Sequence, residues 1–346
     1  MCVTDSELHD RRALPPFTLL MSVYAGNTMR ELERAVQSGT IEQQLPPSQV
    51  VIVRDGPVPE EMQRYLDSLQ STVAVWFAVE YPLMEPPTVT IVPLERNHGL
   101  AHALNVGLKY CEYDYVARAD CDDVSLPNRF STIMPHFVGQ HKAGHASDDT
   151  IDVVGSAIRE FQGDEDHPGQ VRLLPAEGKE LERYARMQSP VHHPSAVFRK
   201  AAVLDAGGYP ENAGRFEDYL LWERMMLNHA HFLNVPQPLV LYRTNQEAYE
   251  RRGGFAMFRE ECRLQWRFLR DGFTNAWEFV RNVVVRAAYR VTPTAIRKRA
   301  YHALVERHNV TLGDDQLHPP PAPHGRHNPA AVNDAARTNA GSGSEG

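Results

Sequence analysis

Three carboxylates stand within four residues, at Asp120, Asp122 and Asp123, directly after a short apolar run. In extended backbone Asp120 and Asp122 point the same way, because alternate side chains of a strand share one face. Two hard oxygen ligands on one face suit Mg²⁺ or Mn²⁺, whose shells are usually completed by water and substrate phosphates. Such an ion neutralises charge on a departing diphosphate, so the cluster indicates a metal site for phosphate chemistry.

A solvated acidic turn is the alternative interpretation of this cluster, since Asp is common before helices and a helix begins near Pro127. Taken alone, the two interpretations are of similar strength. The position beyond an apolar strand, with Arg118 two residues before Asp120, favours the metal site.

A second acidic pair, Glu217-Asp218, opens a segment in which Leu221, Met225 and Met226 recur at helical spacing. The helix dipole stabilises the ionised form of carboxylates in the first turn, which favours a general base over a general acid. Simple helix capping is the alternative, and in isolation it is the more common role.

The histidines and cysteines add no second metal site. His192 and His193 are adjacent and precede Pro194, a spacing that fits neither a helix-face metal site nor a catalytic triad, so a structural or general binding role is favoured. The 4 cysteines form no CxxC pair, which excludes a zinc knuckle and a secreted disulfide framework and fits a reducing cytosol.

Short apolar runs that alternate with helix-like segments must position these residues. Strands are predicted over 17–23, 50–53, 89–92 and 115–117, and helices over 29–38, from 59 to about 69, and from 99 through 108. Strands that alternate with helices indicate βαβ units and a mostly parallel sheet, so the predicted fold class is α/β.

Each predicted strand ends at a polar cluster. The clusters are Tyr24-Ala25-Gly26-Asn27, Arg54-Asp55-Gly56, Asn97-His98-Gly99 and Asp120-Cys121-Asp122-Asp123. Ligands of parallel sheets bind beyond the carboxyl ends of the strands, so the clusters are expected to converge on one site. No Gly-x-Gly-x-x-Gly follows a predicted strand, and no P-loop pattern occurs, so a phosphate bound there needs another counter-charge.

The bulk properties narrow the class of protein. With 346 residues the chain can bury one large core, and its net charge of -8 gives no reason to expect nucleic acid as a partner. The first residues lack the basic and apolar parts of a signal peptide, and no run reaches the roughly 20 apolar residues of a membrane span. A cytoplasmic protein is predicted.

Eight segments occur in an order that resembles the family 2 glycosyltransferases, in particular the bacterial branch that builds capsular and exopolysaccharide repeat units of the amylovoran type. The segments are MSVYAGN, IVRDGP, LERNHGLAHALNVGL, ARADCDDVSLPNRF, DVVGSAIREF, HHPSAVFRKAAVLDAGGYPE, FEDYLLWERM and LYRTNQEAYERRGG. One such motif is weak evidence, whereas the ordered set, which covers residues 17–254, is specific.

The resemblance implies a GT-A fold, in which a nucleotide-binding sheet flanked by helices delivers an Asp-x-Asp metal motif. The expected layout is an N-terminal extension over 1–16, a catalytic domain over 17–254, a basic helical region over 255–312 and a disordered tail over 313–346. Within the catalytic domain, a nucleotide-sugar half reaches to about 125 and an acceptor half follows to 254.

Site residues follow from the resemblance by position. The nucleotide-sugar site comprises Tyr24, Asp55, Asn97, Gly99, Arg118, Asp120, Arg251 and Arg252. Asp55 would contact the base, Asp120 the ribose or the metal, and Asp122 the metal at the diphosphate. Asp218 would be the catalytic base, with Glu217 beside it. Arginines suit the diphosphate because their planar fork matches phosphate oxygens.

The implied reaction is a single displacement that inverts the anomeric configuration. The implied partners are a nucleotide-sugar donor, UDP-linked by family habit, and a saccharide acceptor that is lipid-linked in this branch, with Mn²⁺ or Mg²⁺ as cofactor. A nucleotidyltransferase is an alternative, but it should carry a glycine-rich basic loop that MSVYAGN lacks. A non-catalytic sugar-nucleotide-binding protein would not need both acidic pairs.

Three segments depart from the family pattern or extend beyond it. Cys121 and Ala119 stand where Ser and Met are common, and neither change removes a ligand. The segment 70–88 is unusually long and apolar, which suggests an extra hairpin or a surface patch. Residues 273–304 interleave apolar side chains with arginines, which favours a helix on an anionic membrane surface over one that only packs on the core.

Overall fold

The computed structural model of the chain describes residues 14–138, 150–244 and 255–291. Most of the predicted N-terminal extension, the whole predicted tail, and the predicted diphosphate ligands Arg251 and Arg252 lie outside the described residues. The predicted basic helical region is described as far as Val291.

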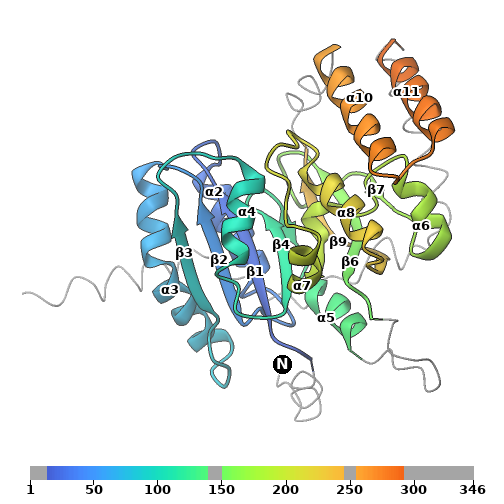
Figure 1. The fold of residues 1–346 in the computed structure, drawn as a ribbon. Coiled ribbons are helices and arrows are strands. Elements are labelled where there is room, and N and C mark those ends of the chain that lie inside the picture. Colours follow the sequence, from blue (N-terminus) through green and yellow to red (C-terminus); the bar gives the residue numbers. More distant parts are fainter. Residues whose placement is uncertain (1–13, 139–149, 245–254, 292–346) are drawn as a thin grey trace, which may run out of the picture. The chain divides into compact units, whose positions relative to one another are not determined.

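Four parallel strands form the first half of the sheet, in the order β3-β2-β1-β4 (Figure 1). They are β1 Phe17–Val23, β2 Gln49–Arg54, β3 Thr88–Pro93 and β4 Tyr115–Asp120, and the helices between them are α2 Met29–Gly39, α3 Glu60–Glu80 and α4 Leu100–Leu108. Every strand predicted from an apolar run is present. The alternation of strands and helices confirms the predicted α/β class.

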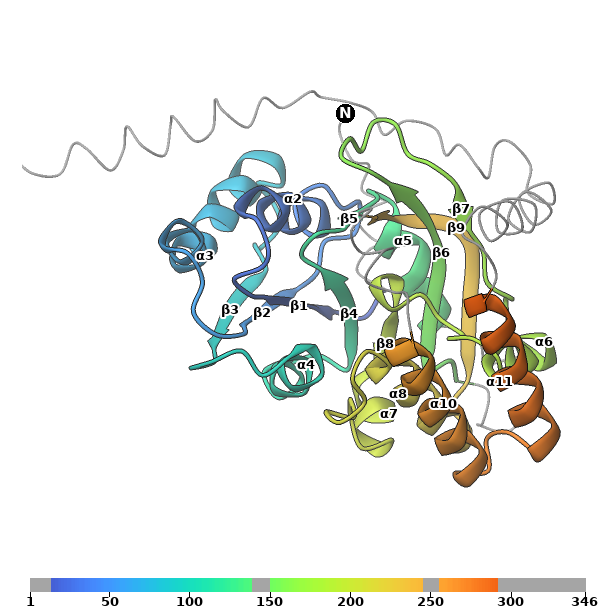
Figure 2. The same ribbon diagram turned by 90° about the horizontal axis from the view of Figure 1, so that it is seen from above.

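Alternate residues of β1 belong to two separate cores. Leu19 and Met21 pack with α2 and α3, whereas Leu20 packs with α4. Figure 2 shows α2 and α3 on one face of these strands and α4 on the other. A strand that is buried on both faces needs apolar side chains at successive positions, which explains the nearly unbroken apolar run of β1.

Helix α3 is longer than predicted and includes much of the segment 70–88. It continues to Glu80 because Val73 and Phe77 extend the buried row begun by Leu66 and Leu69 at helical spacing. The extra hairpin suggested for this segment is therefore wrong. The long apolar stretch is the last two to three turns of a helix that covers the sheet.

Beyond β4 the sheet continues through β8, β6, β9 and β5, with mixed strand directions. The elements are β5 Val124–Ser125, α5 Arg129–Ile133, η1 Met134–Phe137, β6 Val153–Phe161, β7 Val171–Arg172, α6 Gly178–Ala185, η2 His193–Ser195, β8 Val197–Arg199, α7 Lys200–Asp205, α8 Glu217–Leu227 and β9 Phe232–Arg243. β5 directly follows the acidic cluster and pairs antiparallel with β9. The last strand of the acceptor half thus reaches the end of β4.

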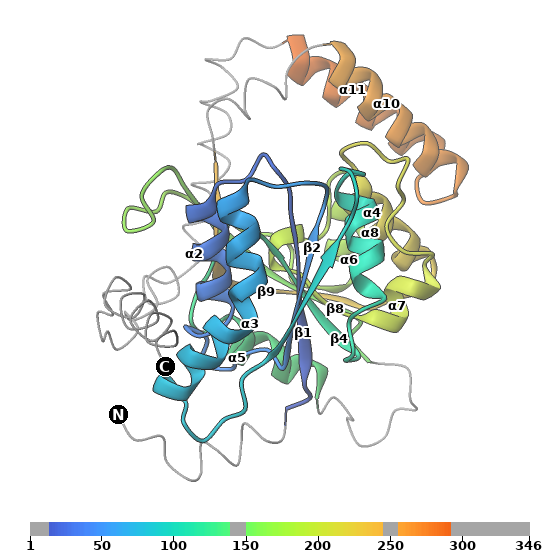
Figure 3. The same cartoon turned by 90° about the vertical axis from the view of Figure 1, so that its left-hand side faces the viewer.

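Helices α10 Phe255–Arg270 and α11 Ala276–Val291 lie side by side after the sheet (Figure 3). Leu264, Phe268 and Phe273 form one apolar cluster with Tyr219 and Leu220 of α8, so this pair of helices packs on the catalytic core. Among the described helices, none combines the length and the apolar character that crossing a membrane requires.

Asn105 of α4 links the two halves of the sheet through the backbone of Tyr209. Its Nδ2–H donates to the Tyr209 carbonyl at 2.7 Å, and its Oδ1 accepts from the Tyr209 N–H at 2.8 Å. Gly208, with φ of +70°, approaches so closely that a Cβ there would lie 2.7 Å from Asn105 Oδ1. This contact holds the loop before α8 against the donor half.

Replacing Asn105 by Ala leaves two backbone groups of the buried Tyr209 without their partner. We expect Asn105→Ala to lower the free energy of unfolding by about 1–3 kcal/mol, measured by urea denaturation. Asn228→Ala is the matched control, because Asn228 makes one exposed bond of 3.3 Å to the Asp205 carbonyl. An equally small effect of both substitutions would contradict the linking role of Asn105.

Candidate active site

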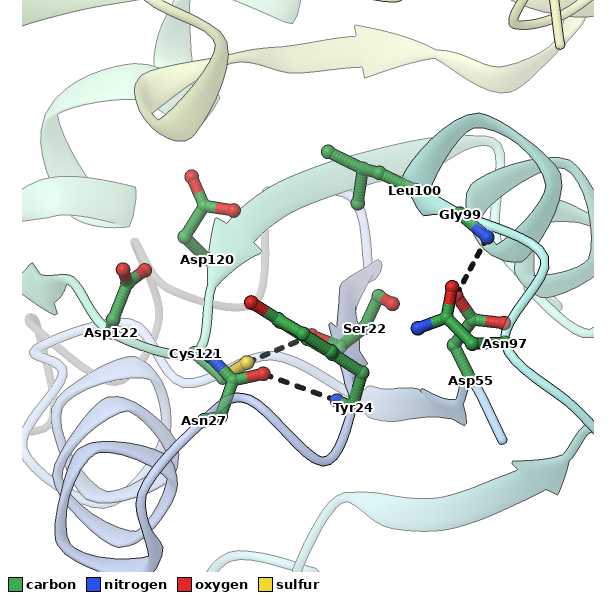
Figure 4. A pocket seen from close by; sticks show the side chains of 10 residues that line it. All are labelled: Ser22, Tyr24, Asn27, Asp55, Asn97, Gly99, Leu100, Asp120, Cys121 and Asp122. Carbon is green, nitrogen blue, oxygen red and sulfur yellow. Dashed lines mark hydrogen bonds between the residues drawn. The ribbon is translucent and has the colours of Figure 1, made fainter. Parts of the chain in front are cut away.

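A pocket of about 360 Å³ opens where the parallel strands end (Figure 4). Its lining residues are Ser22, Tyr24, Asn27, Asp55, Asn97, Gly99, Leu100, Asp120, Cys121 and Asp122. All four predicted polar clusters contribute to it, so their predicted convergence is confirmed. Six of the residues assigned to the nucleotide-sugar or metal site line this one pocket.

The ring of Tyr24 projects into the pocket, with Asp120 and Asp122 on one side and Asp55 and Asn97 on the other (Figure 4). The side chain is 47% exposed, so one face of the ring is available to a ligand. The Tyr24 N–H donates to Asn27 Oδ1 at 3.1 Å, which fixes the loop that carries the ring. A flat exposed ring is suited to stacking on a nucleobase.

Asp55 is an anchor for the pocket wall as well as part of its lining. Its two carboxylate oxygens accept the backbone N–H groups of His98 at 2.7 Å and Gly99 at 2.9 Å. Gly99 has φ of +92°, a backbone conformation that favours glycine. The carboxylate therefore holds the loop before α4 in place, and only its remaining lone pairs are free for the base contact that the resemblance implies.

The acidic cluster is compact. One carboxylate oxygen each of Asp120, Asp122 and Asp123 lie within 4.8 Å of one another. Asp120 and Asp122 line the pocket, whereas Asp123 is buried and its Oδ1 accepts the Arg243 N–H at 2.8 Å. The two half-buried carboxylates of the pocket lining are thus available to a ligand, and the third anchors the turn.

This donor set fits a hard divalent cation. Burial and the neighbouring Asp120 raise the pKa of Asp122 to about 6, and burial raises the pKa of Asp123 well above its usual range. Asp123 Oδ2 is buried without a hydrogen-bond partner among the described residues. A bound cation stabilises crowded carboxylates most where their oxygens lack hydrogen-bond partners, and it would reverse these pKa shifts.

Arg118, which the resemblance assigns to the nucleotide sugar, is not part of the pocket lining. Its side chain is 2% exposed and makes an ion pair with Asp120 from behind. Its charge also offsets part of the rise that burial causes in the pKa values of Glu217 and Asp218. Arg118 is thus a buried cation that pairs with a carboxylate of the pocket lining, and its assignment to the nucleotide sugar stays a prediction.

The acids of α8 are less readily ionised than the helix dipole predicts. Burial, with repulsion from Glu217, raises the pKa of Asp218 to about 7, and the amides at the helix start lower it by less. Burial also raises the pKa of Glu217, whose Oε2 has no hydrogen-bond partner among the described residues. The amides at the helix start act in the direction expected from the helix dipole, but the effect of desolvation on the pKa is larger.

The paired histidines are buried, neutral parts of the interior. His192 Nε2 lies 3.2 Å from the Arg172 carbonyl, and His193 Nε2 lies 3.0 Å from the Tyr209 hydroxyl. Burial lowers the pKa of His192 to about 3 and lowers the pKa of His193 well below its usual range. Within the described residues the acidic cluster is the one group of three or more potential metal ligands, in agreement with the structural role favoured for the histidines.

Sequence reasoning missed several residues around the pocket. Ser22, Asn27, Leu100 and Cys121 line it, and Cys121 donates its S–H to the Ser22 carbonyl at 2.8 Å. Asn27 and Cys121 lie within the quoted polar clusters, so their position in sequence was a usable signal. Arg243, which contacts the acidic turn, is 120 residues from Asp123 and no local pattern connects the two.

The sequence profile described as glycosyl transferase family 2 matches residues 27–206, just over half of the chain. The chain belongs to this family. This family 2 glycosyltransferase is 30% identical over 293 residues to the UDP-Gal:alpha-D-GlcNAc-diphosphoundecaprenol beta-1,3-galactosyltransferase of Escherichia coli, with 85% of this chain and 98% of that protein covered. It is 31% identical over 288 residues to the amylovoran biosynthesis glycosyltransferase AmsE of Erwinia amylovora, covering 82% and 97%.

Solved structures confirm a GT-A-like fold for this glycosyltransferase. S. aureus TarS 1-349 in complex with UDP-GlcNAc superposes with a TM-score of 0.52 at 16% identity, covering 73% of this chain and 66% of that one, just under two thirds. The mannosyltransferase PcManGT from Pyrobaculum calidifontis, in complex with GDP-Man and Mn2+, gives a TM-score of 0.50 at 16% identity, with 95% and 81% covered.

The raised pKa of Asp218 predicts a pH-dependent loss of stability. The folded state favours the neutral carboxyl of Asp218. Below the unfolded pKa of about 4 the carboxyl is neutral in both states and has no effect on stability. As pH rises from there toward about 7, the cost of ionising it in the folded state destabilises the fold increasingly. Asp218→Asn stays neutral and should gain stability over wild type between about pH 4 and pH 8, by on the order of 1 kcal/mol or more.

Urea denaturation across this pH range measures the difference between Asp218→Asn and wild type. Glu60→Gln is the control, since the Glu60 side chain is 89% exposed and should show no such gain. A constant difference between Asp218→Asn and wild type at all pH values would show that the Asp218 carboxyl titrates normally in the folded protein.

Proposed function

We propose that this glycosyltransferase is inverting and metal-dependent, and that it moves a sugar from a UDP-sugar to a hydroxyl group of a lipid-linked saccharide. The observation that carries the proposal is the arrangement around Arg118. This buried cation makes an ion pair with Asp120 of the pocket lining, and its charge also offsets part of the rise that burial causes in the pKa values of Glu217 and Asp218. The proposed donor site and the proposed base are thus linked through one buried positive charge.

The donor is inferred from the pocket together with the relatives. The exposed Tyr24 ring offers a stacking surface, and Asn97 and Asp55 offer polar groups beside it. The E. coli relative is named for UDP-Gal, and the TarS neighbour was solved with UDP-GlcNAc. The Pyrobaculum neighbour, with GDP-Man, is far less similar in sequence than the E. coli relative, so UDP is the favoured nucleotide.

Asp120 and Asp122 are the residues that would hold Mn²⁺ or Mg²⁺, because both line the pocket and carry oxygen ligands. When bound, the ion would neutralise charge on the diphosphate. Arg118 keeps Asp120 oriented through its ion pair, and Asp123 ties the turn to β9. Arg251 and Arg252, outside the described residues, stay predicted diphosphate ligands.

Asp218 is the proposed base. Its carboxylate takes the proton of the acceptor hydroxyl while the hydroxyl oxygen forms a bond to the anomeric carbon. The bond from that carbon to the diphosphate oxygen breaks on the opposite face, so the configuration inverts. A pKa of about 7 suits this role, because the group is substantially ionised near neutral pH and is still a competent proton acceptor. Glu217 beside it strengthens the base by repulsion.

Two isosteric variants should separate donor binding from transfer. Asp122→Asn should abolish the Mn²⁺-dependent rise in melting temperature that UDP causes, because one pocket-facing ligand is lost. Asp218→Asn should keep that rise, while transfer falls by about 10²–10⁴-fold for lack of a base. Retained metal-dependent UDP binding in Asp122→Asn would exclude Asp122 as a ligand. Normal turnover of Asp218→Asn would remove it as the base.

The acceptor's lipid would bring the enzyme to a membrane surface, and the pair α10 and α11 carries a face suited to that contact. On α11, Trp277, Val280 and Val284 are 73%, 49% and 59% exposed and share one side of the helix. On α10, Arg259 and Arg263 are exposed, and Trp266, 60% exposed, follows on the same side. Exposed tryptophans beside arginines suit an anionic bilayer interface.

Two of the arginines in the predicted basic helical region make contacts within the chain. Arg286 of α11 donates to the Met187 carbonyl at 2.6 Å, and Arg281 donates to Asn282 Oδ1 at 3.1 Å. These two arginines are therefore occupied within the chain, and among the side chains that the structure describes, Arg259 and Arg263 of α10 are the exposed arginines beside this face. Trp266 packs against Phe279 with ring centroids 5.9 Å apart, which joins the basic side of α10 to the apolar side of α11.

Removing the exposed apolar side chains of α11 should release the protein from anionic vesicles. We expect Trp277→Ser with Val284→Ser to weaken flotation with phosphatidylglycerol vesicles by at least about tenfold, since two large apolar groups no longer enter the interface. Val79→Ser with Leu83→Ser is the matched control, because these residues are exposed near the end of α3. Equal flotation of both variants would exclude α11 as the contact.

A further inference from the structure

Arg243, the last residue of β9, makes two hydrogen bonds to the acidic turn. Its backbone N–H donates to Asp123 Oδ1 at 2.8 Å, and its side-chain Nε–H donates to the Asp122 carbonyl at 2.8 Å. Both bonds span about 120 residues of chain. One arginine therefore holds the backbone and a side chain of the turn that presents the pocket-facing carboxylates.

The same guanidinium also reaches the start of α2. Its Nε lies 3.6 Å from Glu31 Oε1, and Glu31 Oε2 accepts the Thr28 N–H at 3.0 Å in the capping box that begins α2. Thr28 directly follows the loop that carries Tyr24. Arg243 thus connects the acidic turn to the start of the helix beside the aromatic ring.

Packing fixes the side chain of Arg243 in this position. The guanidinium carbon lies 4.5 Å from the centre of the Phe161 ring on β6, and the side chain is 15% exposed. An arginine can stack on a ring and still direct Nε–H at a carbonyl, whereas a lysine ammonium cannot make both contacts in this fixed geometry. The arrangement is specific to arginine.

Crowded carboxylates need such a support. The oxygens of Asp120, Asp122 and Asp123 lie within 4.8 Å of one another and repel when ionised, so a loosely held turn would relax by moving them apart. Groups that orient metal ligands from behind typically affect metal affinity 10- to 100-fold when they are removed. Arg243 contacts the turn through the Asp122 carbonyl and through Asp123.

We propose that Arg243 is a positioning residue of the donor site, which holds Asp122 and the start of α2 in the arrangement that binds a divalent cation and a nucleoside diphosphate. The inference rests on the proposed metal-dependent function. It assigns to the end of the acceptor half a role in donor binding. Arg243 acts through the turn and touches no reacting atom.

The test compares Arg243→Gln and Arg243→Lys with wild type in the full chain, with Mn²⁺ alone and then UDP with Mn²⁺ as probes. Arg199→Gln is the matched control, because Arg199 also donates Nε–H to a carbonyl, that of Ile151 at 3.0 Å, and lies 5.1 Å from the Tyr115 ring. Mn²⁺ binding is measured by electron paramagnetic resonance, and UDP binding by calorimetry.

We expect Arg243→Gln to bind Mn²⁺ about 10- to 100-fold more weakly than wild type. Arg243→Lys should also bind Mn²⁺ more weakly than wild type. Arg199→Gln should bind Mn²⁺ like wild type even if it loses similar stability. Excess Mn²⁺ should restore most of the UDP affinity of Arg243→Gln, which a merely misfolded site would not allow. Arg243→Lys tests the same point if Arg243→Gln does not fold.

Mn²⁺ binding by both Arg243 variants at wild-type strength would overturn the proposal, as would an equal loss in Arg199→Gln. These results differ from failure of the proposed function, in which folded wild-type protein binds neither Mn²⁺ nor UDP. Wild-type binding combined with unaffected Arg243 variants would leave the metal site in place and remove only the positioning role.

Discussion

Mutual repulsion of three carboxylates is the constraint on which the rest of the site depends. Asp120, Asp122 and Asp123 are held close together at the end of β4, where each charge raises the cost of ionising the next. Cations and backbone bonds on the protein side oppose this repulsion, through the Arg118 ion pair and the backbone N–H of Arg243. The carboxylates at the end of β4 are suited to a cation because the surrounding groups already hold them close together.

Arg118 extends this constraint to the acceptor side. Being buried, it exerts its charge through a medium of low polarity, and it acts on Asp120 and on the acids of α8 at once. Arg129 holds the backbone beneath it, with Nη2 donating to the Arg118 carbonyl at 2.6 Å and to the Pro194 carbonyl at 2.9 Å. Desolvated acids such as Asp218 lower stability, and proteins commonly retain that cost where activity needs it.

The sequence predicts local features of this fold well and distant ones poorly. The strand β1 and the start of α8 follow from runs of side chains a few residues long, and the pocket follows from the rule that parallel strands share an edge. The length of α3 was underestimated because Val73 and Phe77 continue a weakly amphipathic helix that resembles a strand locally. The burial of Arg118 and the reach of Arg243 depend on pairing between distant strands, which no local pattern encodes.

Because the Arg243 contacts join distant parts of the chain, the acidic turn is synthesised long before the residue that supports it. A chain emerging from the ribosome completes β1 to β4 and the three carboxylates long before it reaches β9, because synthesis proceeds from the N-terminus. Until β9 emerges, β5 has no partner strand and the acidic turn lacks the bonds that span about 120 residues. The nascent parallel half of the sheet therefore carries an acidic turn without its support, and the proposed site is complete only after β9 has been synthesised.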